Sequence, residues 1–135
     1  MSLRIYSDGG ARGNPGPAAF AIVAVKDGVT IFEHAEFLGE RTNNYAEYRG
    51  LIAAITKAVE LNEDDVEFVM DSELVVKQMN GEYKVKADNI KSLYKDAKAL
   101  SSMIEKTRFT HVKREDRMIS RADALLNMEM DLNSQ

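Results

Sequence analysis

The distribution of apolar and polar residues along the chain predicts a succession of strands and helices. Short apolar runs bounded by turn residues predict five strands, at residues 3–8, 19–25, 29–38, 66–70 and 108–112. Apolar residues that recur every three or four positions predict four helices, at about residues 44–61, 72–79, 88–106 and 120–131. Glycine-containing turn signals, Asp27-Gly28 and Asn80-Gly81, separate two pairs of these elements.

The order of the predicted elements indicates how the sheet is assembled. The first three strands follow one another directly, as antiparallel strands do, whereas helices precede the fourth and fifth strands. Right-handed crossovers make these two strands parallel to the first. We therefore predict an α/β fold with a five-stranded mixed sheet in the order 3-2-1-4-5 and helices on both faces. No repeat or linker interrupts the sequence, so one domain is expected over residues 1–135.

Composition and charge exclude several kinds of protein and site. The 135 residues include no cysteine, which excludes disulfides, thiolate nucleophiles and cysteine-ligated zinc. No apolar run is long enough to span a membrane and no signal peptide is visible, so a cytoplasmic protein is expected. The net charge of −4 argues against a protein that simply coats nucleic acid. Basic residues gather at 77–98 and 106–121, and each segment alone is most simply a solvated surface.

Four acidic residues stand where strands end or helices begin. Asp8 and Asp71 end apolar strands, and Glu47 and Asp123 are predicted near the starts of helices. Each has an ordinary explanation as a turn residue, a cap or a partner of a helix dipole. Those explanations do not account for convergence. Parallel neighbouring strands bring Asp8 and Asp71 to one edge of the sheet, and the two helix starts bring Glu47 and Asp123 to the same edge. A divalent cation relieves the repulsion among such carboxylates, and oxygen ligands favour Mg²⁺ or Mn²⁺.

Four segments between residues 6 and 127 form an ordered set of motifs. They are Tyr6 to Pro17 (YSDGGARGNPGP), Thr42 to Tyr48 (TNNYAEY), Asp71 to Gln78 (DSELVVKQ) and Ala122 to Asn127 (ADALLN). Together they resemble the motifs of the type 1 ribonuclease H family, in a compact form without the long basic loop of some members. The resemblance implies an endonuclease that hydrolyses the RNA strand of RNA/DNA hybrids with two Mg²⁺ or Mn²⁺ ions, leaving 5′-phosphate and 3′-hydroxyl ends. It assigns catalysis and metal binding to Asp8, Glu47, Asp71 and Asp123.

Contacts to the nucleic acid are expected from residues around these acids. Discrimination of RNA from DNA depends on the 2′-hydroxyl, for which amides and other polar groups are suitable. The residues expected to bind nucleic acid are Gly9, Asn14, Thr42, Asn43, Asn44, Glu73, Gln78, Lys84, Lys86 and Arg114. Among them, the resemblance implies minor-groove contacts for Asn14 and Asn44, and a DNA-phosphate pocket for Thr42 and Asn43. A helix cap is the alternative role of Asn43 and Asn44.

Several alternatives remain open at the level of sequence. Asp116 is a rival to Asp123 for the fourth carboxylate, because the segment between Arg114 and Asp123 is longer than in the family pattern. A different enzyme on the same fold and a non-catalytic nucleic-acid-binding module are the rival functions. A monomer is expected, with a dimer left open. His34 and His111 are interpreted as structural or surface residues.

Overall fold

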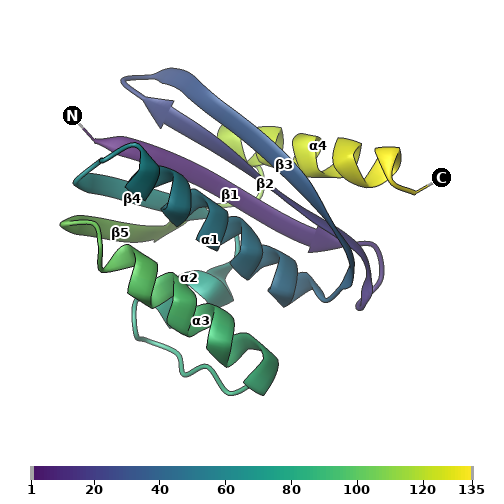
Figure 1. The fold of residues 1–135 in the computed structure, drawn as a ribbon. Coiled ribbons are helices and arrows are strands. Elements are labelled where there is room, and N and C mark those ends of the chain that lie inside the picture. The colour runs from purple at the N-terminus through teal and green to yellow at the C-terminus, as the bar shows by residue number, and fades with distance from the viewer. Residues whose placement is uncertain (1, 135) are drawn as a thin grey trace.

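Residues 2–134 are described by a computed structural model, in which they form five strands and four helices (Figure 1). In chain order these are β1 (Leu3–Ala11), β2 (Gly16–Lys26), β3 (Val29–Arg41), α1 (Asn43–Glu60), β4 (Asp65–Met70), α2 (Glu73–Met79), α3 (Asp88–Ser101), β5 (Lys106–His111) and α4 (Arg117–Leu132). None of the helices within residues 2–134 is long and apolar enough to cross a membrane.

The five strands form one mixed sheet in the order β3-β2-β1-β4-β5, which confirms the predicted topology. β1 pairs with β2 and β2 with β3 in antiparallel fashion. β4 lies parallel to both β1 and β5. The parallel register, with Tyr6 opposite Val69, brings the ends of β1 and β4 to the same edge of the sheet.

Helices cover both faces of the sheet (Figure 1). On one face, Leu3 and Ile5 of β1 belong to a core with apolar residues of α1, α2 and α3. On the other face, Tyr6 of β1 belongs to a second core with Ile119 and Leu126 of α4. This division follows from the alternation of side chains along a strand, because successive residues point to opposite faces.

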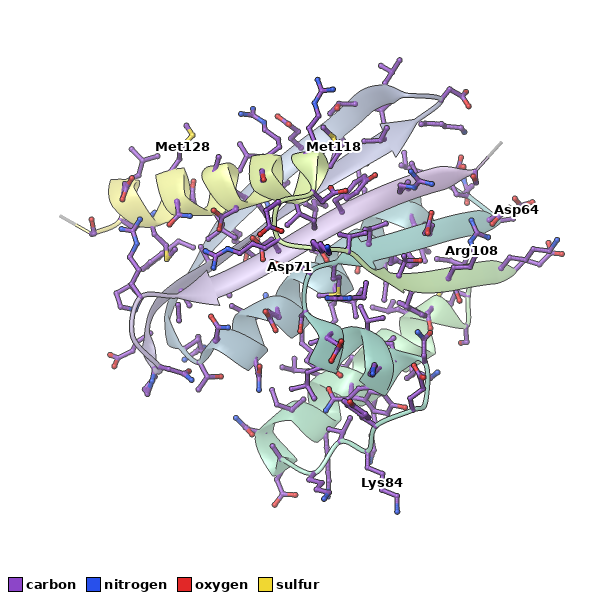
Figure 2. The ribbon with its side chains drawn as sticks, turned by 180° about the vertical axis from the view of Figure 1, so that it is seen from behind. Asp64, Asp71, Lys84, Arg108, Met118 and Met128 are labelled. Carbon is purple, nitrogen blue, oxygen red and sulfur yellow. The ribbon has the colours of Figure 1, made fainter. Side chains whose placement is uncertain are left out.

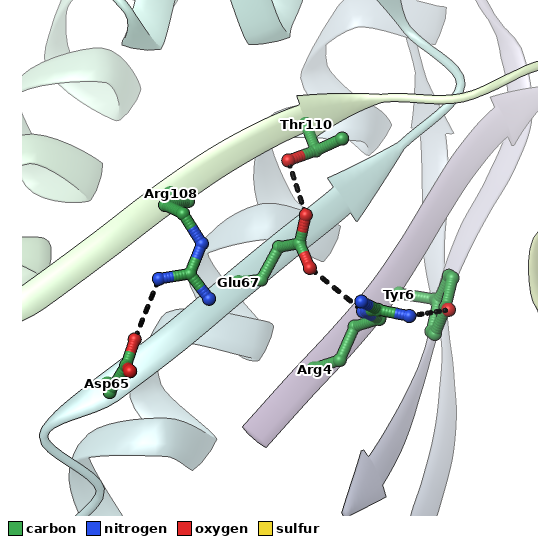
Figure 3. A network of polar contacts seen from close by, with 6 residues as sticks. All are labelled: Arg4, Tyr6, Asp65, Glu67, Arg108 and Thr110. Carbon is green, nitrogen blue, oxygen red and sulfur yellow. Dashed lines mark hydrogen bonds and ion pairs between the residues drawn. The ribbon is translucent and has the colours of Figure 1, made fainter. Parts of the chain in front are cut away.

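The face beneath α4 is only partly covered, because α4 packs on β1, β2 and β3. Beyond it, six side chains of β1, β4 and β5 form a polar network: Arg4, Tyr6, Asp65, Glu67, Arg108 and Thr110 (Figure 3). Glu67 is its centre, since its carboxylate accepts hydrogen bonds from Arg4 Nε at 2.9 Å and from Thr110 Oγ1 at 2.7 Å. Paired polar groups therefore cover this part of the sheet in place of a helix.

Some element boundaries differ from the sequence-based prediction. β1 continues through Gly9 and Gly10 to Ala11, because these residues remain paired with β2. α3 ends at Ser101, and Lys106, which was predicted to end that helix, begins β5. α4 begins at Arg117, three residues earlier than predicted.

Candidate active site

The four predicted acids come from four different elements and line one cleft. Asp8 lies in β1, Glu47 in α1, Asp71 directly after β4, and Asp123 in α4. The cleft has a volume of about 310 Å³, and its other lining residues are Gly9, Gly10, Ala11, Arg12, Asn43, Arg114, Leu126, Asn127 and Met130. Figure 2, viewed from the side of α4, shows Asp71 near the centre of the molecule. The predicted convergence of the four acids is thus present.

Two of the acids lie deeper in their elements than the sequence suggested. Glu47 is the fifth residue of α1, which begins at Asn43, and so lies beyond its first turn. Asp123 is the seventh residue of α4. Attraction to a helix N-terminus is therefore not the reason for these positions, since that effect falls off within the first turn.

A glycine allows β1 to approach α1 closely beside the acids. A Cβ atom on Gly9 would lie 2.4 Å from the backbone carbonyl of Ala46, the residue before Glu47. No side chain larger than hydrogen fits at that distance, so Gly9 brings Asp8 and Glu47 together by steric necessity. Gly9 therefore has a packing role in addition to its expected role in nucleic-acid binding.

Burial and mutual repulsion make two of the carboxyl groups hard to ionise. Burial raises the pKa of Asp8 to about 8, and the charges of Asp71, Asp123 and Glu47 add to the rise, while the Gly9 N–H opposes it. Burial also raises the pKa of Glu47 to about 7; a hydrogen bond with Ser72 acts in the opposite direction. Both acids therefore favour a proton or a cation near neutral pH.

The donor atoms of the cleft suit a hard divalent cation. Four carboxylates and no histidine or cysteine line it, which is the ligand chemistry of Mg²⁺ or Mn²⁺. Within residues 2–134, no three acidic, histidine or cysteine side chains are arranged to hold one metal ion as they stand. The composition of the site thus fits such an ion.

The structure separates Asp123 from its rival. Asp116 is the N-cap of α4, and its carboxylate accepts hydrogen bonds from the backbone N–H groups of Met118 (2.9 Å) and Ile119 (3.1 Å). Asp123 lines the cleft with the other three acids, whereas Asp116 does not. The cap also explains why α4 begins earlier than predicted.

Several predicted nucleic-acid contacts form a hydrogen-bonded frame at the start of α1. Thr42 caps the helix, and its hydroxyl accepts a hydrogen bond from Tyr45 N. Asn43 Oδ1 accepts from Ala11 N at 3.1 Å, and Asn14 Oδ1 accepts from Asn43 N at 3.0 Å. The oxygens of both amides are thus used within the protein.

A second pocket brings together four more of these residues. Asn44, Gln78, Lys84 and Lys86 line a volume of about 240 Å³ between α1, α2 and the loop before α3. Gln78 is buried, and its Oε1 accepts a hydrogen bond of 2.6 Å from Tyr48. The remaining two predicted contacts lie elsewhere: Arg114 is in the acidic cleft, and Glu73 is exposed at the start of α2.

The histidines lie outside the acidic cleft. His111 is an exposed residue at the end of β5. His34 lies in β3, where its ring stacks on Phe32 and meets the edge of Phe20. Neither histidine lines the cleft, in agreement with their interpretation as structural or surface residues.

Arg12 and Asn127 are the polar cleft residues that sequence reasoning did not single out. Both lie inside the motif segments, and Asn127 stands four residues after Asp123, which places the two on the same side of α4. That spacing was a usable signal for Asn127. Arg12 lies in the loop between β1 and β2, whose periodicity carries no such signal.

The sheet order and the cleft of four acids define a protein of the ribonuclease H fold. The model of the family described as reverse transcriptase-like matches residues 6–128. This family has the ribonuclease H-like domain, and the chain belongs to it.

Solved structures with similar sequences have the same fold. The N-terminal RNase H domain of a Mycobacterium tuberculosis protein has a TM-score of 0.92 and 41% identity, with 97% of this chain and 100% of that chain covered. RNase H1 from the archaeon Halobacterium salinarum has a TM-score of 0.91 and 39% identity, with 97% and 98% covered. LC11-RNase H1, solved in complex with an RNA/DNA hybrid, has a TM-score of 0.91 and 38% identity, with 98% and 99% covered.

Curated relatives extend beyond the matched region. A bifunctional protein of Mycobacterium tuberculosis is 43% identical over 137 residues, which include all of this chain but only 37% of that protein. Ribonuclease HI of Halobacterium salinarum is 40% identical over 130 residues, which are 96% of this chain and 64% of that protein. The chain thus spans less than two thirds of the length of either relative.

Proposed function

We propose that this chain is an endonuclease that hydrolyses the RNA strand of RNA/DNA hybrids with divalent metal ions. The observation that carries the proposal is the cleft lined by Asp8, Glu47, Asp71 and Asp123. The relatives named ribonuclease H and the similar protein solved with a hybrid support the choice of substrate.

The carboxylates of Asp8, Glu47, Asp71 and Asp123 are proposed to hold two Mg²⁺ or Mn²⁺ ions. Bound there, the ions would lower the pKa of a water and stabilise the leaving 3′ oxygen, giving 5′-phosphate and 3′-hydroxyl ends. The protein supplies the arrangement: Asp8 is anchored by its hydrogen bond from Gly9 N at 3.0 Å, and Glu47 is held beside it by the close contact of β1 with α1. Because the pKa values of Asp8 and Glu47 are raised, a cation that binds them near neutral pH would displace protons from these two groups.

The nucleic acid is proposed to lie across the cleft and the second pocket. Because the oxygens of Asn14 and Asn43 are engaged internally, their N–H groups remain as the donors for the substrate. Lys84 and Lys86 add positive charge at the second pocket, and Arg114 adds it within the acidic cleft. Phosphates of the hybrid are the natural partners of these cations.

The decisive experiment is a titration of Mg²⁺ and Mn²⁺ against cleavage of an end-labelled RNA/DNA hybrid. All-DNA duplex, double-stranded RNA and single strands serve as substrate controls. We expect cleavage of the RNA strand of the hybrid and none of the all-DNA duplex, and loss of cleavage in Asp8→Asn and Asp71→Asn. Asp88→Asn, which changes an exposed acid at the start of α3, is the matched control and should cleave normally. Metal-dependent cleavage by both cleft variants, or none by the unmodified chain, would refute the proposal.

A further inference from the structure

Arg12 connects the loop between β1 and β2 to the helix that carries Asp123. Its Nη2 donates a hydrogen bond of 3.1 Å to Asn127 Oδ1, approaches the Asn127 backbone carbonyl at 3.4 Å, and forms an ion pair of 2.8 Å with Asp131. These contacts join residues separated by more than a hundred positions in the sequence. Arg12 and Asn127 both line the acidic cleft.

Asn127 passes this contact on to Asp123. Its Nδ2 donates a hydrogen bond of 2.9 Å to the backbone carbonyl of Asp123, one helical turn earlier. Asp123, Asn127 and Asp131 are spaced four residues apart and therefore form a polar stripe along one side of α4. Arg12 contacts Asn127 and Asp131, and Asn127 contacts Asp123.

The same loop is fixed to α1, the helix that carries Glu47. Ala11 N donates to Asn43 Oδ1, and Asn14 Oδ1 accepts from Asn43 N. The end of β1 and the loop that follows it are therefore bonded to both helices that supply an acid to the cleft. Arg12 is the link to α4.

We propose that Arg12 is a positioning residue: through Asn127 it fixes the cleft-facing side of α4, so that Asp123 is held where the other three acids can share a cation with it. This inference rests on the proposed metal-dependent function. The Arg12 side chain is 42% exposed and that of Asp131 is 67% exposed, so their ion pair contributes little to overall stability. Loss of Arg12 should accordingly alter the site rather than unfold the protein.

Calorimetric titration with Mn²⁺ tests the inference without relying on activity. Arg12→Gln should weaken Mn²⁺ binding by roughly tenfold, the effect typical of removing a residue that orients a metal ligand, and Arg12→Lys should recover part of the loss. Asn127→Ala should weaken it to a similar degree, and the double variant should show little further loss, because both changes break one chain of contacts. At saturating Mg²⁺, the KM of Arg12→Gln for the hybrid should stay close to that of the unmodified chain.

Arg121 offers a matched control on the same helix. It forms two hydrogen bonds with Glu33 of β3, at 2.9 and 3.0 Å, and does not line the cleft. Arg121→Gln removes a comparable surface ion pair and should keep the Mn²⁺ affinity unchanged.

The outcomes distinguish this inference from the proposed function. If Arg12→Gln keeps its Mn²⁺ affinity while its KM rises and the salt dependence of hybrid binding falls, Arg12 contacts phosphate directly and the positioning role is wrong. Equal losses of affinity in the Arg12 and Arg121 variants would also overturn it. If the unmodified chain neither binds Mn²⁺ nor cleaves hybrids, the proposed function fails first, and this inference with it.

Discussion

Replacing Asp8 by asparagine should stabilise the metal-free protein near neutral pH. The folded protein retains the Asp8 proton up to a pKa of about 8, whereas the unfolded chain releases it near the ordinary value of 3.8. As pH rises from about 4 to about 8, the unfolded state therefore gains more from ionisation than the folded state, and the free energy of unfolding falls. Asp8→Asn removes this term, and the asparagine oxygen can still accept the hydrogen bond from Gly9 N.

The magnitude follows from the distance between the working pH and the ordinary pKa. At pH 7 the gap from 3.8 is about 3 pH units, and each unit corresponds to roughly 1.4 kcal/mol, so the ionisation term is about 4 kcal/mol. The cleft acids repel one another, so removing the Asp8 charge also changes the ionisation of the others. We therefore expect Asp8→Asn to raise the free energy of unfolding by about 2 to 4 kcal/mol at pH 7.

Urea unfolding in the presence of EDTA, at several pH values between 4 and 9, measures this effect. The difference in unfolding free energy between Asp8→Asn and the unmodified chain should be small at pH 4, grow up to about pH 8 and then level off. Glu105→Gln, a change at an exposed acid between α3 and β5, is the matched control. A difference that does not vary with pH, or a variant less stable at pH 8, would contradict the reasoning.

Three further predictions concern single residues. Asp116→Ala should lower the free energy of unfolding by about 1 kcal/mol through loss of the α4 cap, yet it should keep hybrid cleavage at low temperature. Asp123→Asn should abolish cleavage. If thermal unfolding and cleavage assays show the reverse pattern, Asp116 and not Asp123 is the fourth acid of the site. Glu67→Gln should lower the free energy of unfolding by about 1 to 2 kcal/mol at pH 7, because hydrogen bonds from Thr110 and Arg4 lower the Glu67 pKa although burial opposes this. This stabilisation is lost as pH falls through the lowered pKa. Urea unfolding near pH 3 should therefore show a smaller difference between the variant and the unmodified chain. Gly9→Ala should lower the free energy of unfolding by about 2 kcal/mol or more in thermal unfolding. Gly10→Ala should cost far less, because its added Cβ meets only ordinary contacts at 3.7 Å and beyond. Equal costs for the two variants would contradict the packing argument.

The fold and two of the acids could be predicted because their signals are local. Asp8 and Asp71 each come after a run of largely apolar strand residues, and the hairpin and crossover connections determine which strands are neighbours. The start of α4 was harder to predict, because the residues before Ser120 show no clear helical periodicity. Only the hydrogen bonds of Asp116 show that this acid caps the helix.

The contacts around the acids could not be read from sequence for a different reason. Arg12 and Asn127 meet across the fold, and no periodicity relates positions so far apart. The close approach of Gly9 to Ala46 likewise depends on how α1 lies against the sheet. A motif identifies such residues as a set, whereas only the packed structure separates those that face the cleft from those that hold it together.

The cap at Asp116 also sets the rotational phase of α4. Asp123 follows the cap by seven residues, which is roughly two helical turns. Residues inserted or deleted between β5 and Asp116 change the length of a loop and leave that phase intact. One residue added between Asp116 and Asp123 would turn the acid about 100° around the helix axis and away from its partners. Variation in chain length is therefore tolerable ahead of the cap and disabling behind it.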